Sequence, residues 1–259
     1  MLELAPHHKR GLALTNPMMN ASGILGFAGE QRGLIDFAAL GAFVTNALTW
    51  TPRTSARAPN IMEAPGGVAL HTGLPNPGVR AAVRRYAREW ARLGCPVIAH
   101  LAATSPSDVG RAVDILERTD SVTGIELGLR EDVTAHELTQ LIQAARGGPP
   151  LLVRLPLQRA TALSEAAVHT GADALTIGAP TRHSVQMGER TLTGRFYGPD
   201  VFPLMLATLT AVAAQTLGVP LIGAGGLFSI DTVQTALVAG ATAVQVDAVL
   251  WREPQFIRL

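Results

Sequence analysis

Short apolar runs recur along the whole chain, and most are followed by a loop and then by an amphipathic helical pattern. The runs are rich in β-branched residues and almost continuously apolar, which is typical of parallel strands buried on both faces. About eight alternating units favour a closed (β/α)₈ barrel, with an open doubly wound sheet as the second interpretation. The strands are predicted at Met18–Ser22, Ala42–Leu48, Pro96–Ala102, Gly124–Leu129, Leu151–Pro156, Ala174–Ala179, Pro220–Ala224 and Ala243–Ala248.

The helices between these runs are marked by their periodicity and by their first residues. Serine or threonine often precedes them, as at Ser105, Ser107 and Thr134, where a side-chain oxygen can accept from free amides. The length of 259 residues suits one TIM barrel, so residues 1–259 are predicted to form a single domain that opens with a strand pair within Met1–Asn16. The helices are predicted at Val79–Leu93, Ser107–Glu117, Ala135–Arg146, Leu204–Leu217 and Ile230–Val238.

Composition narrows the classes of function. A net charge of +1 predicts no general attraction to nucleic acid or to anionic membranes. No signal peptide or membrane-spanning run is visible, so the cytoplasm is the expected compartment. The only lysine, Lys9, precedes the first barrel strand, which argues against Schiff-base chemistry. The only cysteine, Cys95, rules out an internal disulfide or a multi-cysteine metal cluster and is interpreted as a small buried hydrophobe.

Functional side chains of such a barrel are expected in the loops that follow the strands. The strongest local signal is Gly223–Gly226 after the seventh strand, because glycine amides and a following helix N-terminus can hold a phosphate. A tight turn without a ligand explains these glycines equally well. The residues at or just after the ends of the predicted strands are Asn46, His100, Gly128, Arg154, Ala179, Gly225, Gly226 and Asp247, and these are the candidate site residues.

Several modest motifs, taken in one order, resemble the dihydroorotate dehydrogenase family in its class 1-like form. They are Asn16–Gly23 with Phe27, Val44-Thr45 with Thr49, Pro52 and Arg53, Pro65–Gly67, Gly73–Gly78, Pro96–Ala99, Ile125–Leu127, Gly198-Pro199 and Gly225 to Val246. The resemblance covers roughly residues 10 to 250. It implies an FMN barrel that oxidises dihydroorotate to orotate in pyrimidine synthesis, and it suggests a homodimer that binds a small-molecule ligand.

The resemblance also implies site residues. A substrate pocket is expected at Leu70, His71, Thr72, Gly73 and Leu74. FMN is expected at Ala21, Ser22, Gly23, Asn46, His100, Arg154, Gly198, Gly225, Gly226, Asp247 and Ala248.

Many polar residues of the family are replaced in this chain. Asn46 and Arg154 stand where the family carries lysines, and the fourth-strand loop that carries the family's base is shortened to Gly128–Asp132. Removal of a substrate proton needs a base, and a planar charged pyrimidine needs buried amide partners. The family's asparagines are replaced by Leu70, His100, Gly128 and Ala179.

Two further departures bear on the cofactor. Asp247 replaces a glycine whose amide faces the FMN phosphate in the family, and an ionised carboxylate there would repel a phosphate. Asp247 could instead accept from the amides of the last helix and fill the anion site from within. Arg195, Phe196 and Tyr197 stand where the family prefers small residues over the flavin, and they could fill its cavity.

Three functions follow from these residues. The first is a divergent FMN oxidoreductase with an altered substrate or very low activity, and the second is a barrel that has lost FMN and serves as a binding or assembly protein. The third is a cofactor-free isomerase or lyase that uses His100 and Arg154, the two weak catalytic candidates. No metal site is predicted, because His71 and His100 lack a clear third ligand. Glu126 is expected to be a buried partner of an arginine, and Thr181–Thr193 a mobile surface loop.

Overall fold

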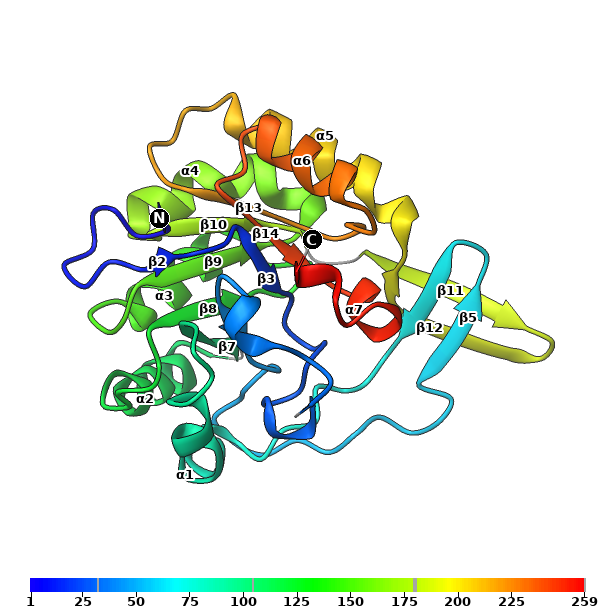
Figure 1. Ribbon diagram of the computed structural model, residues 1–259, viewed down its shortest axis with the longest axis horizontal. Coiled ribbons are helices and arrows are strands. Elements are labelled where there is room, and N and C mark those ends of the chain that lie inside the picture. Colours follow the sequence, from blue (N-terminus) through cyan, green and yellow to red (C-terminus); the bar gives the residue numbers. More distant parts are fainter. Residues whose placement is uncertain (32, 104, 179–180, 259) are drawn as a thin grey trace.

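The centre of the fold is one sheet of eight parallel strands, seen in Figure 1. The computed structural model describes residues 1–31, 33–103, 105–178 and 181–258. The predicted (β/α)₈ barrel is confirmed. The strands lie side by side in the order β3 (Met18–Asn20), β14 (Ala243–Val246), β13 (Leu221–Ala224), β10 (Ala174–Ile177), β9 (Leu151–Leu155), β8 (Gly124–Gly128), β7 (Val97–Ala102) and β4 (Phe43–Val44).

One buried side chain joins the two end strands, β3 and β4. The Asn20 side chain accepts from the Val44 amide at 3.0 Å and donates to the Val44 carbonyl at 2.7 Å. A backbone hydrogen bond from Gly41 to the Met18 carbonyl lies just before it. Asn20 therefore supplies the donor and the acceptor that a backbone ladder would otherwise provide between these strands.

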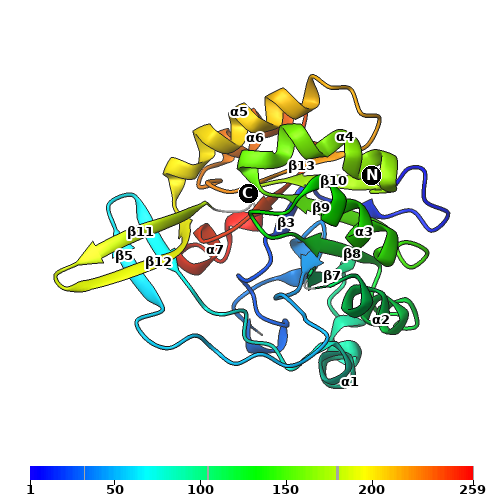
Figure 2. The same ribbon diagram turned by 180° about the vertical axis from the view of Figure 1, so that it is seen from behind.

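Helices surround the sheet on its outer side (Figures 1 and 2). Their starts follow the predicted capping residues: Ser105 accepts from the Asp108 amide, and Thr134 forms a capping box with Glu137. Ser107 lies inside the helix that Ser105 caps. The helices are α1 (Val79–Trp90), α2 (Pro106–Glu117), α3 (Ala135–Ala145), α4 (Ala160–Thr170), α5 (Phe202–Ala213), α6 (Ile230–Val238) and α7 (Val249–Arg252), with single 3₁₀ turns at Gly29–Gln31, Phe37–Ala39, Leu157–Arg159, Pro199–Val201 and Phe256–Arg258.

The lower interior of the barrel is apolar and is closed by the N-terminal strand pair. Strands β1 (Leu2–Glu3) and β2 (Ala13–Leu14) pair antiparallel, as predicted. Their neighbours pack into one buried cluster with side chains from the barrel strands, because alternate residues of each strand point inward. The cluster comprises Leu4, Ala5, Leu12, Leu14, Met19, Ala42, Val44, Ile98, Leu152, Ala174, Ile222 and Ala243.

A second, four-stranded antiparallel sheet extends away from the barrel in Figures 1 and 2. It contains β5 (Ile61–Ala64), β6 (Gly67–Leu70), β11 (Arg182–Met187) and β12 (Arg190–Tyr197). The prediction of a loop at Thr181–Thr193 was wrong, because most of that segment forms the β11–β12 hairpin. Its polar residues were misleading: the hairpin exposes most of its side chains to solvent and is held by its backbone ladder and by pairing with β6.

Several predicted strands end earlier than expected, and two of them are instructive. The second ends at Val44 because the Asn46 amide donates to the Gly26 carbonyl instead of continuing the ladder. The sixth was predicted to reach Ala179, which lies outside the described residues. Among the residues that the structure describes, no helix has the length and apolar character needed to cross a membrane.

Candidate functional site

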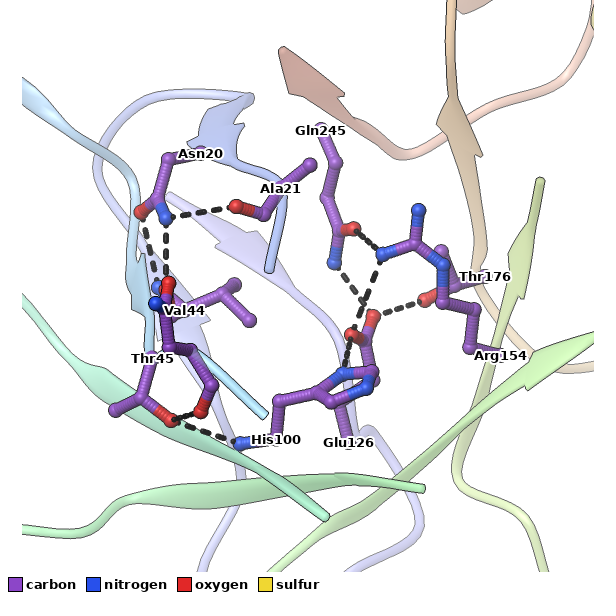
Figure 3. A network of polar contacts seen from close by, with 10 residues as sticks. Asn20, Ala21, Val44, Thr45, His100, Glu126, Arg154, Thr176 and Gln245 are labelled. Carbon is purple, nitrogen blue, oxygen red and sulfur yellow. Dashed lines mark hydrogen bonds and ion pairs between the residues drawn. The ribbon is translucent and has the colours of Figure 1, made fainter. Parts of the chain in front are cut away.

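Five polar side chains form a layer in the barrel just beyond the apolar one, as Figure 3 shows. Most of them stand two residues after an apolar residue that points into the barrel. Because side chains alternate between the two faces of a strand, they point into the barrel as well. All five residues are at most 8% exposed. They are His100 of β7, Glu126 of β8, Arg154 of β9, Thr176 of β10 and Gln245 of β14.

Glu126 is the centre of this layer. One carboxylate oxygen, Oε2, lies 2.6 Å from Nδ1 of His100 and 3.7 Å from Nη1 of Arg154. The other, Oε1, accepts from the Thr176 hydroxyl at 2.8 Å and from Nε2 of Gln245 at 2.6 Å. The predicted pairing of Glu126 with an arginine is confirmed, and both oxygens have polar partners.

The environment of Glu126 favours its ionised form. Burial raises the pKa of this carboxyl, but the hydrogen bond from His100 and the charge of Arg154 act in the opposite direction. The charge of His100 and the hydrogen bond from Thr176 lower it further, and the resulting pKa is about 2. Glu126 is therefore a buried anion at neutral pH, which makes it a structural counter-ion and unsuited to accept a substrate proton.

Arg154 is held at one end of its guanidinium only. Its Nη1 donates to Oε1 of Gln245 at 3.0 Å and faces Glu126. Its Nε is buried and has no hydrogen-bond partner among the described residues. Figure 3 shows the other terminal nitrogen directed away from Glu126. The candidate Arg154 therefore has hydrogen-bond donors that the cluster does not use.

Asp247 lies directly after β14. Its carboxylate accepts from the Ala248 amide at 2.6 Å, and backbone hydrogen bonds from Gly226 and from its own amide also act on it. Burial raises the pKa of Asp247, these amides and the charge of Arg154 lower it, and the outcome is a pKa of about 6. The carboxylate thus holds amides at the mouth of the barrel, as the sequence suggested, although Ala248 precedes α7 rather than lying in it.

The glycine turn beside Asp247 is packed against α5. Gly226 has φ of +73°, and a Cβ there would overlap the Phe202 backbone. Gly225 and Gly226 are both buried. This close packing gives the two glycines a structural role besides any binding role.

Large side chains of β12 also lie at this mouth. Tyr197 is buried, and its ring lies 5.9 Å from that of Trp251. Burial raises the Tyr197 pKa, and the charges of Arg195, Arg154 and Asp247 all act on its hydroxyl.

The remaining predicted residues are more scattered. Ala21 is buried and donates its amide to the Val246 carbonyl, while Gly23 is exposed. Asn46 has a buried side-chain oxygen without a hydrogen-bond partner among the described residues. Ser22 is partly buried, and Gly198 is buried. The predicted pocket residues 70–74 lie at the end of β6 and just after it, and all are at least partly exposed.

Two members of the polar layer, Thr176 and Gln245, were missed by the sequence analysis. Each is the one polar residue in the middle of an apolar strand and follows an inward alanine by two positions, which is the signal that could have found them. Within the described part of the chain, no three His, Cys, Asp or Glu side chains are grouped as a metal would require.

Two hollows in the described part of the chain lie away from this layer. One of about 60 Å³ lies at the starts of α2 and α3, and an open one of about 400 Å³ lies between residues 36–38 and 89–93. Neither is lined by residues predicted to hold FMN.

A model of the family described as "Dihydroorotate dehydrogenase" matches residues 7–258. The chain belongs to the dihydroorotate dehydrogenase family. Relatives include catalytic subunits of dihydroorotate dehydrogenase B (NAD(+)) from Geotalea daltonii, 29% identical over 94% of this chain and 86% of the relative, and from Pelobacter propionicus, 30% identical with the same coverage. The relative from Cutibacterium acnes is also 30% identical. As their names state, these relatives are dehydrogenases, and hence oxidoreductases.

A solved dihydroorotate dehydrogenase has the same fold. The enzyme of Eimeria tenella, crystallised with ferulenol, superimposes with a TM-score of 0.77 over 100% of this chain and 84% of its own. The sequence identity is 17%, so this likeness supports the barrel and no particular ligand.

Proposed function

We propose that this chain is a dihydroorotate dehydrogenase-family barrel that has lost FMN and serves as a binding or assembly protein. The observation that carries this proposal is the Asp247 carboxylate, which accepts from the Ala248 amide at 2.6 Å and interacts with the Gly226 amide. These are backbone donors at the turn where the family resemblance places the FMN phosphate. A carboxylate that takes up these amides leaves them unavailable to a phosphate and repels it as well.

The residues present do not fit FMN at its ring either. Tyr197, with Trp251 beside it, is buried where the family keeps a small residue over the flavin. Phe196, next to it, is buried as well. The protein interior has few voids, so these rings leave no room for another planar ring system in the same place.

Dihydroorotate oxidation needs a base to accept a substrate proton, and residues 128–132 hold neither the serine nor the cysteine that the family resemblance would place there. Gly128 replaces a family asparagine, and the loop that should bear the base is short. Glu126, the carboxylate of the polar layer, has a pKa of about 2 and four polar partners. An anion so stabilised is a weak proton acceptor.

A divergent FMN oxidoreductase is the second candidate. It is supported by the cation at Arg154, by the glycine turn at Gly225 and Gly226, and by the match of the family over residues 7–258. It would need Asp247 and Tyr197 to move from the places they hold in the structure.

Purification of the protein and measurement of its visible absorbance separate the two candidates. The proposal expects a colourless protein that neither retains flavin nor quenches the fluorescence of added FMN, and that does not oxidise dihydroorotate. Tight flavin that copurifies would overturn the proposal in favour of the oxidoreductase.

A variant extends this test. Asp247→Gly combined with Tyr197→Ser removes both obstacles and is expected to bring measurable FMN binding without dihydroorotate oxidation. Asp231→Asn is the matched control, because it removes a carboxylate from the first turn of α6, near the same turn, without opening the site. Equal FMN binding by the control and the double variant would count against Asp247 and Tyr197 as the obstacles.

A further inference from the structure

Helix α1 and the segment that leads to it carry a dense group of arginines. Residues 51–93 contain seven arginines and two carboxylates, whereas the whole chain has 21 basic and 20 acidic residues. The near-neutral total therefore coexists with a local excess of positive charge. The side chains of all seven arginines are exposed: Arg53, Arg57, Arg80, Arg84, Arg85, Arg88 and Arg92.

Four of these arginines recur at every fourth position and form what we call the arginine row. Side chains four positions apart follow one ridge of a helix, so the row runs along α1 and into the turn that ends it, over about 18 Å. The buried side of α1, which includes Tyr86 and Trp90, faces the opposite way. In Figures 1 and 2, α1 lies at the outer edge of the molecule. The row consists of Arg80, Arg84, Arg88 and Arg92.

The positive charge of the arginine row is not compensated within the described part of the chain, where no ion pair involves any of its members. Glu89, the carboxylate of α1, lies off the row and close to Gly29, where a Cβ would be 2.9 Å from its Oε2. Like charges four positions apart destabilise a helix, and Arg80 stands in the first turn, where the helix dipole disfavours a cation. The row therefore costs the fold stability, and an external anion would recover it.

A different feature marks each end of the row. At its start, Cζ of Arg80 lies 4.8 Å from the ring centre of Trp50, which is partly exposed and restrains the guanidinium by a cation–π contact. At its other end, Arg92 lines the open hollow of about 400 Å³, together with the apolar side chains of Phe37 and Leu93. The surface thus combines a line of cations with a recess that has an apolar part.

We propose that the arginine row docks an acidic helical segment of a partner protein, with one apolar side chain of that segment in the hollow beside Arg92. Carboxylates at every fourth position of a helix repeat at the same interval as these arginines, so several ion pairs can form together. The inference deepens the proposed function and rests on it, because it states what kind of partner a binding or assembly protein of this shape would take.

The hollow favours an acidic protein segment over nucleic acid. Its lining includes two carboxylates, Asp36 and Glu89, beside the apolar residues. A nucleic-acid backbone carries a charge at every phosphate and would be repelled there, whereas a protein segment can place a neutral side chain at that point. The row is also too short for the many phosphate contacts that give nucleic acid its affinity.

The test measures fluorescence anisotropy of labelled peptides mixed with the full-length protein. The probe is a synthetic helical peptide of about 16 residues, about 24 Å long, with glutamate at every fourth position and one terminal leucine. A peptide with glutamine in place of each glutamate should bind about 30-fold more weakly, because four exposed ion pairs are lost. A peptide with serine in place of the leucine should bind about fivefold more weakly.

Two double variants locate the effect. Arg84→Gln with Arg88→Gln removes the middle of the row and should weaken binding of the glutamate peptide about fivefold, with Tm unchanged or slightly higher because like charges are removed. Arg190→Gln with Arg252→Gln is the matched control and should keep the binding. It makes the same change of charge at exposed arginines of β12 and α7, which lie apart from α1 in Figures 1 and 2.

The outcomes separate this inference from the proposed function. If the glutamate and glutamine peptides bind equally to a colourless protein, the docking face is overturned and the loss of flavin stands. If the control variant loses as much binding as the row variant, the effect is one of general charge and the docking face is again overturned.

Two further outcomes concern the partner and the flavin. If a single-stranded oligothymidylate of equal charge displaces the peptide at equal concentration, the row is a nucleic-acid site and the protein partner is overturned. A protein purified with tight flavin overturns the proposed function, while peptide binding to that same protein still tests the arginine row.

Discussion

The imidazole of His100 occupies the space that a side chain at residue 128 would need. A Cβ at Gly128 would lie 2.7 Å from Cε1 of His100 and closer still to Nε2. The two positions lie on adjacent strands, where Gly128 pairs with Ala102, two residues beyond His100, and by the family resemblance both replace asparagines. The larger residue at one position thus requires the smaller one at the other.

This relationship predicts a strong coupling between the two sites. Gly128→Ala should reduce the free energy of unfolding by about 1–3 kcal/mol, because the added methyl group forces the imidazole out of its place. In a His100→Ala background the same substitution should cost little, so a double-mutant cycle by urea unfolding should show the difference as an interaction energy.

A glycine in a helix provides the control for this cycle. Gly110→Ala in α2 places its Cβ 3.5 Å from the Ala144 carbonyl, which is an ordinary contact, and should stabilise the protein by about 0.5–1 kcal/mol. Equal costs of Gly128→Ala with and without His100 would refute the coupling.

The buried anion predicts a second effect on stability. Glu126→Gln leaves Arg154 and His100 in the barrel without their counter-ion and should cost about 3–5 kcal/mol in urea unfolding. Adding Arg154→Met to this variant should recover part of the loss, since it removes the uncompensated cation.

The surface pair of Asp36 and Arg258 is the matched control, because both partners are exposed although their atoms are 2.8 Å apart. Asp36→Asn should cost less than about 1 kcal/mol. A similarly small cost for Glu126→Gln would mean that Glu126 is not the anion that its surroundings indicate. Because its folded pKa is low, its contribution should be complete above pH about 4.3 and lost as pH falls through about 2.

Much of the barrel could be predicted because each strand carries its own signal. The apolar runs locate the eight strands, and Ser105 and Thr134 mark where two helices begin. The hairpin at Arg182–Tyr197 could not be predicted in this way, since its exposed polar residues resemble a loop and only pairing with β6 reveals the strands.

The site was predicted less completely than the fold. The positions at strand ends predicted His100, Arg154 and Asp247 as site residues. The hydrogen bonds that such residues form depend on which strands become neighbours, which the sequence pattern does not specify. Gln245 contacts Glu126 across 119 positions of sequence, and no local pattern encodes that distance. Asn20 was noticed only as part of a family motif, yet its side chain joins the first and second barrel strands.

The closure of the barrel by Asn20 is itself testable. Asn20→Leu keeps the approximate volume but leaves the amide and the carbonyl of Val44 without partners in a buried position. This should cost at least about 2 kcal/mol and should speed amide hydrogen exchange at Val44. Unchanged exchange at Val44 would show that the two strands are held together without this side chain.

The raised pKa of Asp247 predicts how stability changes with pH. In the unfolded chain this carboxyl ionises near pH 3.9, whereas burial in the folded protein raises its pKa to about 6. Between these values the unfolded state releases the proton and the folded state retains it, so stability falls as pH rises through this window. The loss should reach about 3 kcal/mol above pH 6, since each pKa unit corresponds to about 1.4 kcal/mol.

The asparagine of an Asp247→Asn variant cannot ionise, so the variant should not lose stability as the pH rises. The free energy of unfolding of the variant minus that of the native protein should therefore grow by about 3 kcal/mol between pH 4 and pH 7, measured by urea unfolding at several pH values. The same series with Asp231→Asn, which alters the first turn of α6 and not the buried turn, gives the baseline. A difference that stays constant with pH would show that the Asp247 carboxylate is as well accommodated in the folded protein as in water, and the amides it holds would then be a favourable anion site filled at no cost.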